Sequence, residues 1–338
     1  MIDKLLSIEI PKEEHGSRID RCIRRLLGNI NQSMLEKYLR SGSILLEKKK
    51  IKSSFKVSVG QLIEYSSNID FENKTIKEYI NEDRYQYYEK LYNKILIKKT
   101  KEYIAINKPS GLAVQGGSSQ KFHIDDMLKY VFKDQTIPKL VHRIDKDTSG
   151  LLLIANDQII AKKLSIFFKE QKIIKTYLAL VSPSPKNNSG FINLPVLKKG
   201  GEGNQRMKVD YDKGKVSLTE YKVLDKVGSR VALVALSPKT GRTHQLRVHL
   251  EHINSPIVGD KKYKGLPGIY SSDSNLNDHD SISQIKWSSE NNNNLQLHAY
   301  SMRLPNNEII EAELNEEFKN NIKFLGLILP RDISKIFI

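Results

Sequence analysis

Apolar and polar positions alternate or recur along this chain in patterns that predict its regular elements. Short alternating runs and brief apolar blocks indicate strands, whereas apolar residues three or four positions apart indicate amphipathic helices. We predict strands at residues 95–97, 103–106, 152–155, 173–181, 216–223, 231–236, 295–299 and 301–304. We predict helices at residues 121–132, at residues 157–171 and in a short segment that begins after Thr243. Strands outnumber long helices, which favours an α+β domain built on a mixed, mostly antiparallel sheet.

A separate basic module precedes this domain at residues 12–65, after a lead-in of residues 1–11. Its apolar spacing predicts two short helices, and the second is expected to end at Ser41-Gly42. Strand-like segments follow at residues 44–46 and 57–63, on either side of a Lys-rich turn. We therefore expect a small, independently folded unit at the N-terminus.

The rest of the chain divides by composition. Residues 66–93 are charged and rich in tyrosine, and we interpret them as an interdomain linker. Residues 94–338 are expected to form the large domain. Within it, residues 264–294 are rich in Ser, Asn, Asp and Gly, which indicates a flexible loop.

The charge balance indicates a polyanionic partner. The chain has 55 Lys and Arg against 39 Asp and Glu, a formal net charge of +16, and residues 12–65 contain 12 of these cations against 6 acidic residues. A surplus of this size is expected where a protein neutralises phosphates, although a Lys-rich proteome is an alternative source. The cations of the N-terminal module that we expect to contact RNA are Arg18, Arg21, Arg25, Lys48, Lys49 and Lys50.

Composition also excludes several classes of protein. Cys22 is the single cysteine, which excludes a disulfide framework and a thiolate zinc site. The longest apolar runs fall far below the roughly 20 residues of a membrane helix, so we expect a cytoplasmic protein with no membrane partner. There is no Gly-rich phosphate loop, so a nucleotide cofactor is not expected. Nothing in the pattern suggests more than a monomer.

The most informative segment is the polar turn at residues 142–150 (His-Arg-Ile-Asp-Lys-Asp-Thr-Ser-Gly), which leads directly into an apolar strand. One carboxylate of this turn, Asp145, lies next to a buried strand. We therefore expect it to have either a charged partner or a function. Two further polar segments, residues 107–111 and 240–247, have the composition of tight turns and helix starts. A carboxylate placed among several guanidiniums can act as a nucleophile or stabilise a developing cation.

A metal-dependent phosphoesterase is one alternative. It would use His142, Asp145, Asp147, His244 and His249 as ligands. These residues lack the tight carboxylate or His-x-x-x-His spacing that is typical of such sites, so this hypothesis is weaker.

The three polar segments, in this order, resemble those of the RluA-type pseudouridine synthase family, and Gly259-Asp260 with Tyr263 extends the match. The N-terminal module resembles an S4 domain, a small RNA-binding module of αL type. Gly116-Gly117-Ser118 looks most like type C of the large-subunit enzymes, a branch that modifies 23S rRNA.

This resemblance implies an enzyme that isomerises uridines of 23S rRNA, in a precursor of the large ribosomal subunit, to pseudouridine without a metal or cofactor. Asp145 would be the catalytic carboxylate, acting on a uridine that is flipped out of its stack. Tyr177, at the family's tyrosine position, would stack on the base and help to move the C5 proton. Arg247 would pair with Asp145 and keep it ionised.

Further residues would contact RNA, and two other functions remain open. Arg143 is the competing partner for Asp145 and is expected to touch RNA phosphate or the flipped nucleotide. His142, Arg242 and His244 are expected to line the RNA groove. One alternative is a non-catalytic RNA-binding or ribosome-assembly factor with an inactive synthase domain. The other is a pseudouridine synthase that acts on a different RNA, such as tRNA.

Overall fold

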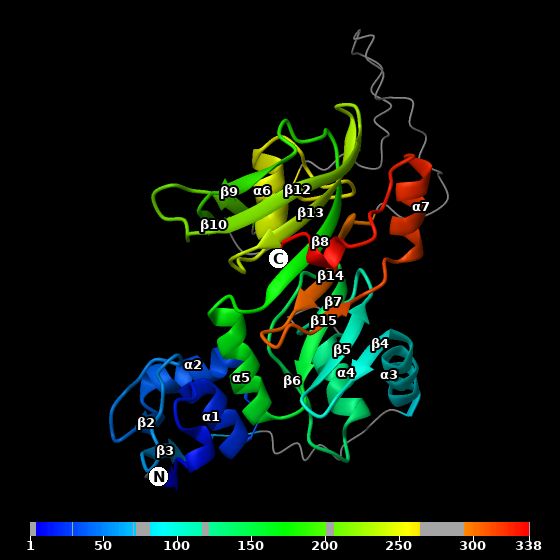
Figure 1. The fold of residues 1–338 in the computed structure, drawn as a ribbon. Coiled ribbons are helices and arrows are strands. Elements are labelled where there is room, and N and C mark those ends of the chain that lie inside the picture. Colours follow the sequence, from blue (N-terminus) through cyan, green and yellow to red (C-terminus); the bar gives the residue numbers. More distant parts are fainter. Residues whose placement is uncertain are drawn as a thin grey trace. The chain divides into compact units, whose positions relative to one another are not determined.

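The computed structural model describes residues 5–28, 30–69, 71, 82–116, 122–200, 206–263 and 294–337 (Figure 1). The chain divides into two compact units, Met1–Asn81 and Glu82–Ile338. The flexible loop predicted at residues 264–294 lies outside the described residues except for Asn294, and so do Gly117 and Ser118.

The N-terminal unit combines two helices with a three-stranded antiparallel sheet of order β1–β3–β2. Its elements are β1 (Leu5–Glu9), η1 (Lys12–Glu14), α1 (Ile19–Leu26), α2 (Gln32–Ser41), β2 (Ile44–Leu46) and β3 (Leu62–Ser66). Gly42 ends α2 in the left-handed conformation, as predicted. Buried apolar residues of both helices and of the sheet form one core.

Two boundaries in this unit differ from the prediction. β1 pairs with β3 from Leu5 to Glu9, so residues 5–9 belong to the folded unit instead of a lead-in. The predicted strand at residues 57–63 begins only at Leu62, because Gly60, with φ +83°, turns the chain just before it.

The larger unit is built on a ten-stranded sheet of order β4–β5–β7–β14–β8–β13–β12–β9, with β15 on β14 and β6 on β7. Only the β7–β14 pair is parallel among the described strands, which confirms the mixed, mostly antiparallel sheet. The strands are β4 (Leu96–Lys99), β5 (Tyr103–Lys108), β6 (Lys139–Leu140), β7 (Ser149–Ala155), β8 (Ile174–Val181), β9 (Ser189–Asn193), β12 (Leu218–Val227), β13 (Val231–Pro238), β14 (Leu297–Arg303) and β15 (Ile309–Glu311).

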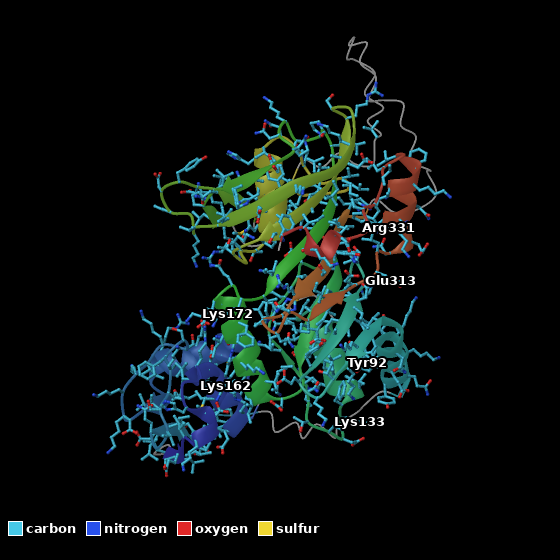
Figure 2. The ribbon with its side chains drawn as sticks, viewed as in Figure 1. Tyr92, Lys133, Lys162, Lys172, Glu313 and Arg331 are labelled. Carbon is cyan, nitrogen blue, oxygen red and sulfur yellow. The ribbon has the colours of Figure 1, made fainter. Side chains whose placement is uncertain are left out.

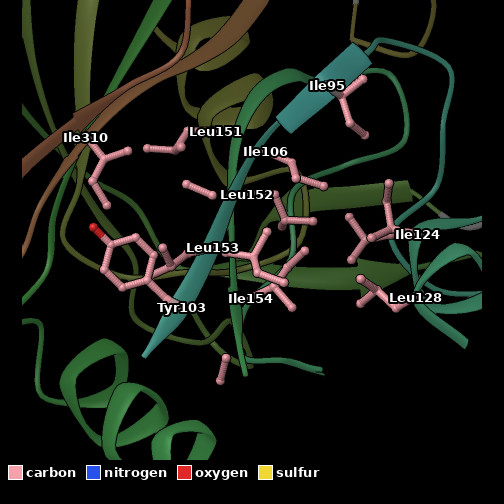
Figure 3. Packing of buried hydrophobic residues seen from close by; sticks show 14 of the residues in the cluster. Ile95, Tyr103, Ile106, Ile124, Leu128, Leu151, Leu152, Leu153, Ile154 and Ile310 are labelled. Atoms are coloured by element: carbon pink, nitrogen blue, oxygen red, sulfur yellow. The ribbon is translucent and has the colours of Figure 1, made fainter. Parts of the chain in front are cut away.

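β7 and β13 form the centre of this unit, since every residue of both strands is buried. The sequences of such strands are continuous apolar runs because both faces of the sheet are covered. The covering helices are α3 (Glu82–Ile95), α4 (Ile124–Val131), α5 (Gln158–Lys169), α6 (Gln245–His252) and α7 (Glu316–Phe324), with a short η3 (Ile333–Lys335). Figure 3 shows apolar side chains of α4 in the same cluster as those of β5 and β7.

α3 occupies most of the C-terminal half of the predicted linker. Tyr88 is fully buried and its hydroxyl donates to Asp126 of α4, while Arg84 forms an ion pair with the same carboxylate at 2.6 Å. Tyr92, labelled in Figure 2, is also buried. Because these contacts tie α3 to α4, residues 82–93 belong to the larger unit.

Other differences follow from weak alternation in the sequence. The two strands predicted around residue 300 are one strand, β14, with an irregular register between Ala299 and Ser301. The prediction missed α7 and the separate two-stranded sheet of β10 (Val196–Lys199) and β11 (Arg206–Val209).

Candidate active site

A buried lysine holds the loop that contains Asp145. Lys108, at the end of β5, is fully buried and donates to the backbone carbonyls of Pro109, Leu112 and Lys146 at 2.8–2.9 Å. Lys146 follows Asp145 directly, so this ammonium group joins the turn at residues 107–111 to the loop before β7.

Burial and hydrogen bonding act in opposite directions on the charge of Lys108. Burial lowers its pKa to about 7, and the charges of Asp147 and Asp145 act in the opposite direction. An ammonium group has three N–H donors and a neutral amine has two, so all three hydrogen bonds form only with the charged side chain.

Two glycines fix the backbone on either side of this contact. Gly111, with φ +82°, donates its N–H to the carbonyl of Lys146 at 3.0 Å. Gly150 has φ +107°, and a Cβ there would lie 2.2 Å from the carbonyl oxygen of Ala299 on β14. Only glycine allows β7 to approach β14 this closely, and the loop therefore enters the sheet at a defined position.

The Asp145 carboxylate lies near Arg247 and His244 without a short hydrogen bond to either of them. Its Oδ2 lies 3.7 Å from Nη1 of Arg247 and 3.8 Å from Nε2 of His244, and its side chain is 20% exposed. Both distances exceed those of hydrogen bonds. Attraction to Arg247 offsets the cost of partial burial while the oxygen lone pairs stay accessible from the cleft.

Arg247 has a different main partner from the one predicted. Its Nε and Nη2 donate to the two oxygens of Asp260 at 2.7 and 2.8 Å, in the parallel geometry of a strong ion pair. Its guanidinium carbon also lies 5.1 Å from the centre of the Tyr263 ring. The predicted Arg247–Asp145 pair is therefore a longer, secondary contact, because the guanidinium is already fully aligned on Asp260.

The hydrogen bonds of Tyr263 orient His244. The Tyr263 hydroxyl accepts from the backbone N–H of Met207 at 3.0 Å and lies 2.8 Å from Nδ1 of His244. The hydroxyl can donate one proton and accept two, so its role toward Nδ1 depends on the tautomer of the ring. Nε2 lies 3.8 Å from Asp145, so the tautomer with its proton on Nε2 directs an N–H toward the carboxylate.

Tyr177, on β8, lies close enough to Asp145 to be affected by its charge. Burial raises the pKa of Tyr177 above its ordinary value, and the negative charge of Asp145 raises it further. The phenol is consequently protonated at neutral pH, so its hydroxyl can serve as a donor.

These groups open onto a cleft of about 540 Å³ within the larger unit, a volume typical of ligand pockets. All seven residues predicted from the central segments line it: His142, Arg143, Asp145, Tyr177, Arg242, His244 and Arg247. They come from the loop before β7, from β8 and from the start of α6, which only the fold brings together.

The residues that line the cleft differ in burial and in hydrogen bonding. His142 accepts a hydrogen bond on Nε2 from the N–H of Leu153, and burial lowers its pKa to about 3, so it is neutral and anchors the loop at the cleft. Arg143 is exposed at the cleft. Arg242 is also exposed, and its Nε donates to the carbonyl of Val216.

The candidate cations of the N-terminal unit fall into two groups. Arg18 pairs with Asp20, and Arg25 pairs with Glu14, so both have partners inside the unit. The other predicted cations are exposed: Arg21, Lys48, Lys49 and Lys50.

The three lysines lie on a tight hairpin turn. Leu46 and Lys49 exchange both backbone hydrogen bonds, and Glu47 and Lys48 between them have φ of 49° and 60°. Two consecutive positive φ values are typical of a two-residue hairpin turn.

Sequence reasoning assigned no role to four residues that shape the site. Asp260 and Tyr263 were noted only as part of the family pattern, and Lys108 only as part of a turn. Lys175 was missed, although it lies two residues before Tyr177 and therefore on the same face of a predicted strand. Burial and ion pairing, which a sequence does not display, identify all four.

The ligands proposed for a phosphoesterase do not come together. Among the described residues, no three His, Cys, Asp or Glu side chains are close enough to hold a metal ion. His249 is fully buried and bonded to Thr219. In the same part of the chain, no helix is long and apolar enough to span a membrane.

Comparisons with known proteins show which family this chain resembles. Residues 102–252 match the family model described as RNA pseudouridylate synthase. A "Ribosomal large subunit pseudouridine synthase C" of Rickettsia conorii is 37% identical over 73% of this chain and 82% of its own length. The protein of that name from Buchnera aphidicola is 32% identical over 95% of this chain and 98% of its own.

Solved structures give the same result. The human RNA pseudouridylate synthase domain containing 4 protein is similar with a TM-score of 0.59 and 27% identity, over 74% of this chain and all of that one. The human domain containing 1 protein has a TM-score of 0.50 and 26% identity, over 66% of this chain and 84% of that one. The chain therefore belongs to the RluA-type family of RNA pseudouridine synthases.

Proposed function

We propose that this enzyme isomerises specific uridines of large-subunit, 23S ribosomal RNA to pseudouridine, with Asp145 as the catalytic carboxylate. The observation that supports the assignment most directly is the position of Asp145 in a cation-lined cleft, 3.7 Å from Arg247. Relatives named for large-subunit synthases of type C support the choice of substrate. A ribosomal RNA substrate would be met in the cytoplasm, where we expect the enzyme to act.

The reaction breaks the bond between C1′ and N1 of uridine, turns the base and joins C1′ to C5. N1 gains a proton and C5 loses one, so the product is an isomer. Asp145 can attack the nucleotide as a nucleophile or stabilise the cationic sugar, because no short hydrogen bond from Arg247 or His244 occupies its lone pairs. Arg247, fixed by Asp260, provides the positive charge beside it.

Tyr177 is proposed to stack on the flipped base. It lines the cleft together with Asp145, and aromatic stacking on a base is worth about 1–3 kcal/mol. Its protonated hydroxyl is also available to donate or relay a proton during the transfer from C5.

The N-terminal unit is proposed to act as an S4-like RNA-binding module. Its exposed cations include the hairpin lysines Lys48, Lys49 and Lys50 and the helix residue Arg21. The match to the Buchnera protein covers 324 residues, more than the larger unit contains, so the similarity reaches into this N-terminal unit. We propose that the unit provides affinity and register while the larger unit performs the chemistry.

The test is to map pseudouridine on 23S rRNA from cells that lack the gene and are complemented with wild type or with Asp145→Asn. We expect discrete sites to disappear in the deletion strain and to return only with wild type. Restoration by Asp145→Asn would exclude Asp145 as the catalytic group.

The same experiment separates the two alternatives. A non-catalytic assembly factor predicts that Asp145→Asn corrects every defect of the deletion strain. A synthase for tRNA predicts an unchanged 23S pattern with sites lost from tRNA.

A further inference from the structure

Lys175 is a cation of the cleft that the proposed mechanism does not use. It precedes Tyr177 by two residues on β8, so the two side chains leave the same face of the strand about 7 Å apart. Both line the cleft, and Lys175 is partly buried. Lys175 therefore lies beside the residue proposed to stack on the flipped base.

Lys175 has no anionic partner in the part of the chain that the structure describes. No hydrogen bond or ion pair joins its ammonium group to those residues, and its charged neighbour is another cation, Lys239. Lys239 is itself paired with Glu220 at 2.7 Å. Burial and the charge of Lys239 lower the pKa of Lys175 to about 8, so most of it is charged at neutral pH.

The surroundings of Lys175 favour an anion. His142, whose pKa is lowered further by the charge of Lys175, is neutral and cannot compensate that charge. Asp145 is the only carboxylate among the described residues that line the cleft, and it is close to Arg247. The cationic residues that line the cleft besides Arg247 are Arg143, Lys169, Lys175, Lys239 and Arg242.

We propose that Lys175 binds a backbone phosphate next to the flipped uridine and thereby fixes the position of the nucleotide beneath Tyr177. The inference rests on the proposed function, since it takes an RNA strand as the substrate. Uracil and ribose are neutral, so the phosphodiester is the group of the substrate that matches an ammonium without a partner. Lys175 is a binding and positioning residue in this account, and Asp145 performs the chemistry.

The test uses RNA oligonucleotides that contain a mapped target uridine, with the phosphates around it replaced one at a time by neutral methylphosphonates. We expect one methylphosphonate replacement, at the phosphate that Lys175 contacts, to lower the affinity of the wild-type enzyme. The factor should equal the loss of affinity that Lys175→Met shows for unmodified RNA. That replacement should have no further effect on Lys175→Met, because this variant already lacks the ammonium group that binds the phosphate.

The salt dependence gives a second readout. Lys175→Met should lower the slope of log affinity against log salt by about 0.7, the value for one phosphate contact on a single strand. Lys175→Arg should retain the slope. The matched control is Lys162→Met, which removes one charge from an exposed position on α5 outside the cleft lining (Figure 2) and should keep the methylphosphonate sensitivity of wild type.

Three outcomes would overturn the inference. Full sensitivity of Lys175→Met to every methylphosphonate that weakens binding to wild type would exclude the phosphate contact. A loss of kcat with an unchanged salt slope would instead assign Lys175 to the base or to the chemical step. Unchanged affinity and kcat would remove it from substrate binding altogether. Turnover by wild type is measured in parallel, and its absence on every rRNA oligonucleotide would contradict the proposed function itself.

Discussion

Arg247 contacts two carboxylates unequally: it donates two hydrogen bonds of 2.7 and 2.8 Å to Asp260 and lies 3.7 Å from Asp145. Asp260 is fully buried and also accepts from the backbone N–H groups of Lys262 and Tyr263. Arg247 thus supports the fold of the α6 region and places charge beside the carboxylate proposed as catalytic.

This double role predicts that Arg247→Met lowers both stability and turnover. The unpaired, buried Asp260 should cost about 3–5 kcal/mol of unfolding free energy. The double variant Arg247→Met/Asp260→Leu removes that charge and should recover much of the stability, as measured by urea denaturation, without recovering turnover. Recovery of turnover together with stability would show that Arg247 acts only through the fold.

Two substitutions of Tyr177 should distinguish its stacking on the base from its role in proton transfer. Tyr177→Phe keeps the ring, so KM should stay within about twofold, while loss of the hydroxyl should lower kcat by about 10²–10⁴-fold. Tyr177→Leu should also raise KM, because stacking worth about 1–3 kcal/mol is lost. Steady-state kinetics on an rRNA oligonucleotide measure both effects, and wild-type kcat in Tyr177→Phe would exclude the hydroxyl from the chemistry.

Lys108→Met should destabilise the enzyme and loosen the Asp145 loop. The change leaves the carbonyls of Pro109 and Leu112 without their donor, at about 1–3 kcal/mol for each one that stays buried and unsatisfied, while the carbonyl of Lys146 still accepts from Gly111. Turnover at a temperature where the variant is still folded should also fall. Lys101→Met, at an exposed position in the same unit, is the control and should match wild type in both measurements.

Buried histidines predict that stability is lost in mild acid. Burial lowers the pKa of His249 and of His298 to about 4, so between pH 6.5 and 4 the unfolded chain binds protons that the folded chain does not. The free energy of unfolding should therefore fall as pH falls through this window, by about 2 kcal/mol per histidine at pH 5.

Replacing one of them tests this linkage. His298→Gln should flatten the pH dependence of the urea midpoint between pH 6.5 and 4, whatever its effect on stability at pH 7. His15→Gln, at an exposed position in the N-terminal unit, should leave the dependence unchanged. Equal slopes in His298→Gln and wild type would contradict the assignment.

The N-terminal hairpin should contribute affinity without chemistry. Replacing Lys48, Lys49 and Lys50 with Gln should weaken RNA binding and lower its salt slope by about 0.7–0.9 for each phosphate that is no longer neutralised. The kcat at saturating RNA should stay at the wild-type value. Lys→Gln changes that lower kcat and leave the salt slope intact would argue against a role in RNA binding.

Most residues of the candidate site were predicted from the sequence because they cluster in three short segments. Asp145, Arg143 and His142 lie within four positions of one another, and tight turns with Pro109 and Gly150 have a distinctive composition. The buried strand β7 was predicted for a related reason, since a short, continuous apolar run is typical of a strand that is covered on both faces.

The individual roles were harder to predict, because a side chain's environment depends on contacts that are distant in sequence. Histidine is a residue type that can contact RNA, but Nε2 of His142 accepts a hydrogen bond from the N–H of Leu153 on β7. Arg18 and Arg25 were expected to contact RNA, and each forms an ion pair within its own unit.

The sequence by itself determined the fold class and the family and indicated the carboxylate that we propose as catalytic, since these depend on local periodicity and on the order of short motifs. The tertiary structure decided which charges are paired. In the structure Arg247 is paired with Asp260, Asp145 has no short hydrogen bond to Arg247 or His244, and Lys175 has no anionic partner among the described residues. Pairing of this kind depends on distance and burial, and these are set only when strands and helices remote in sequence pack together.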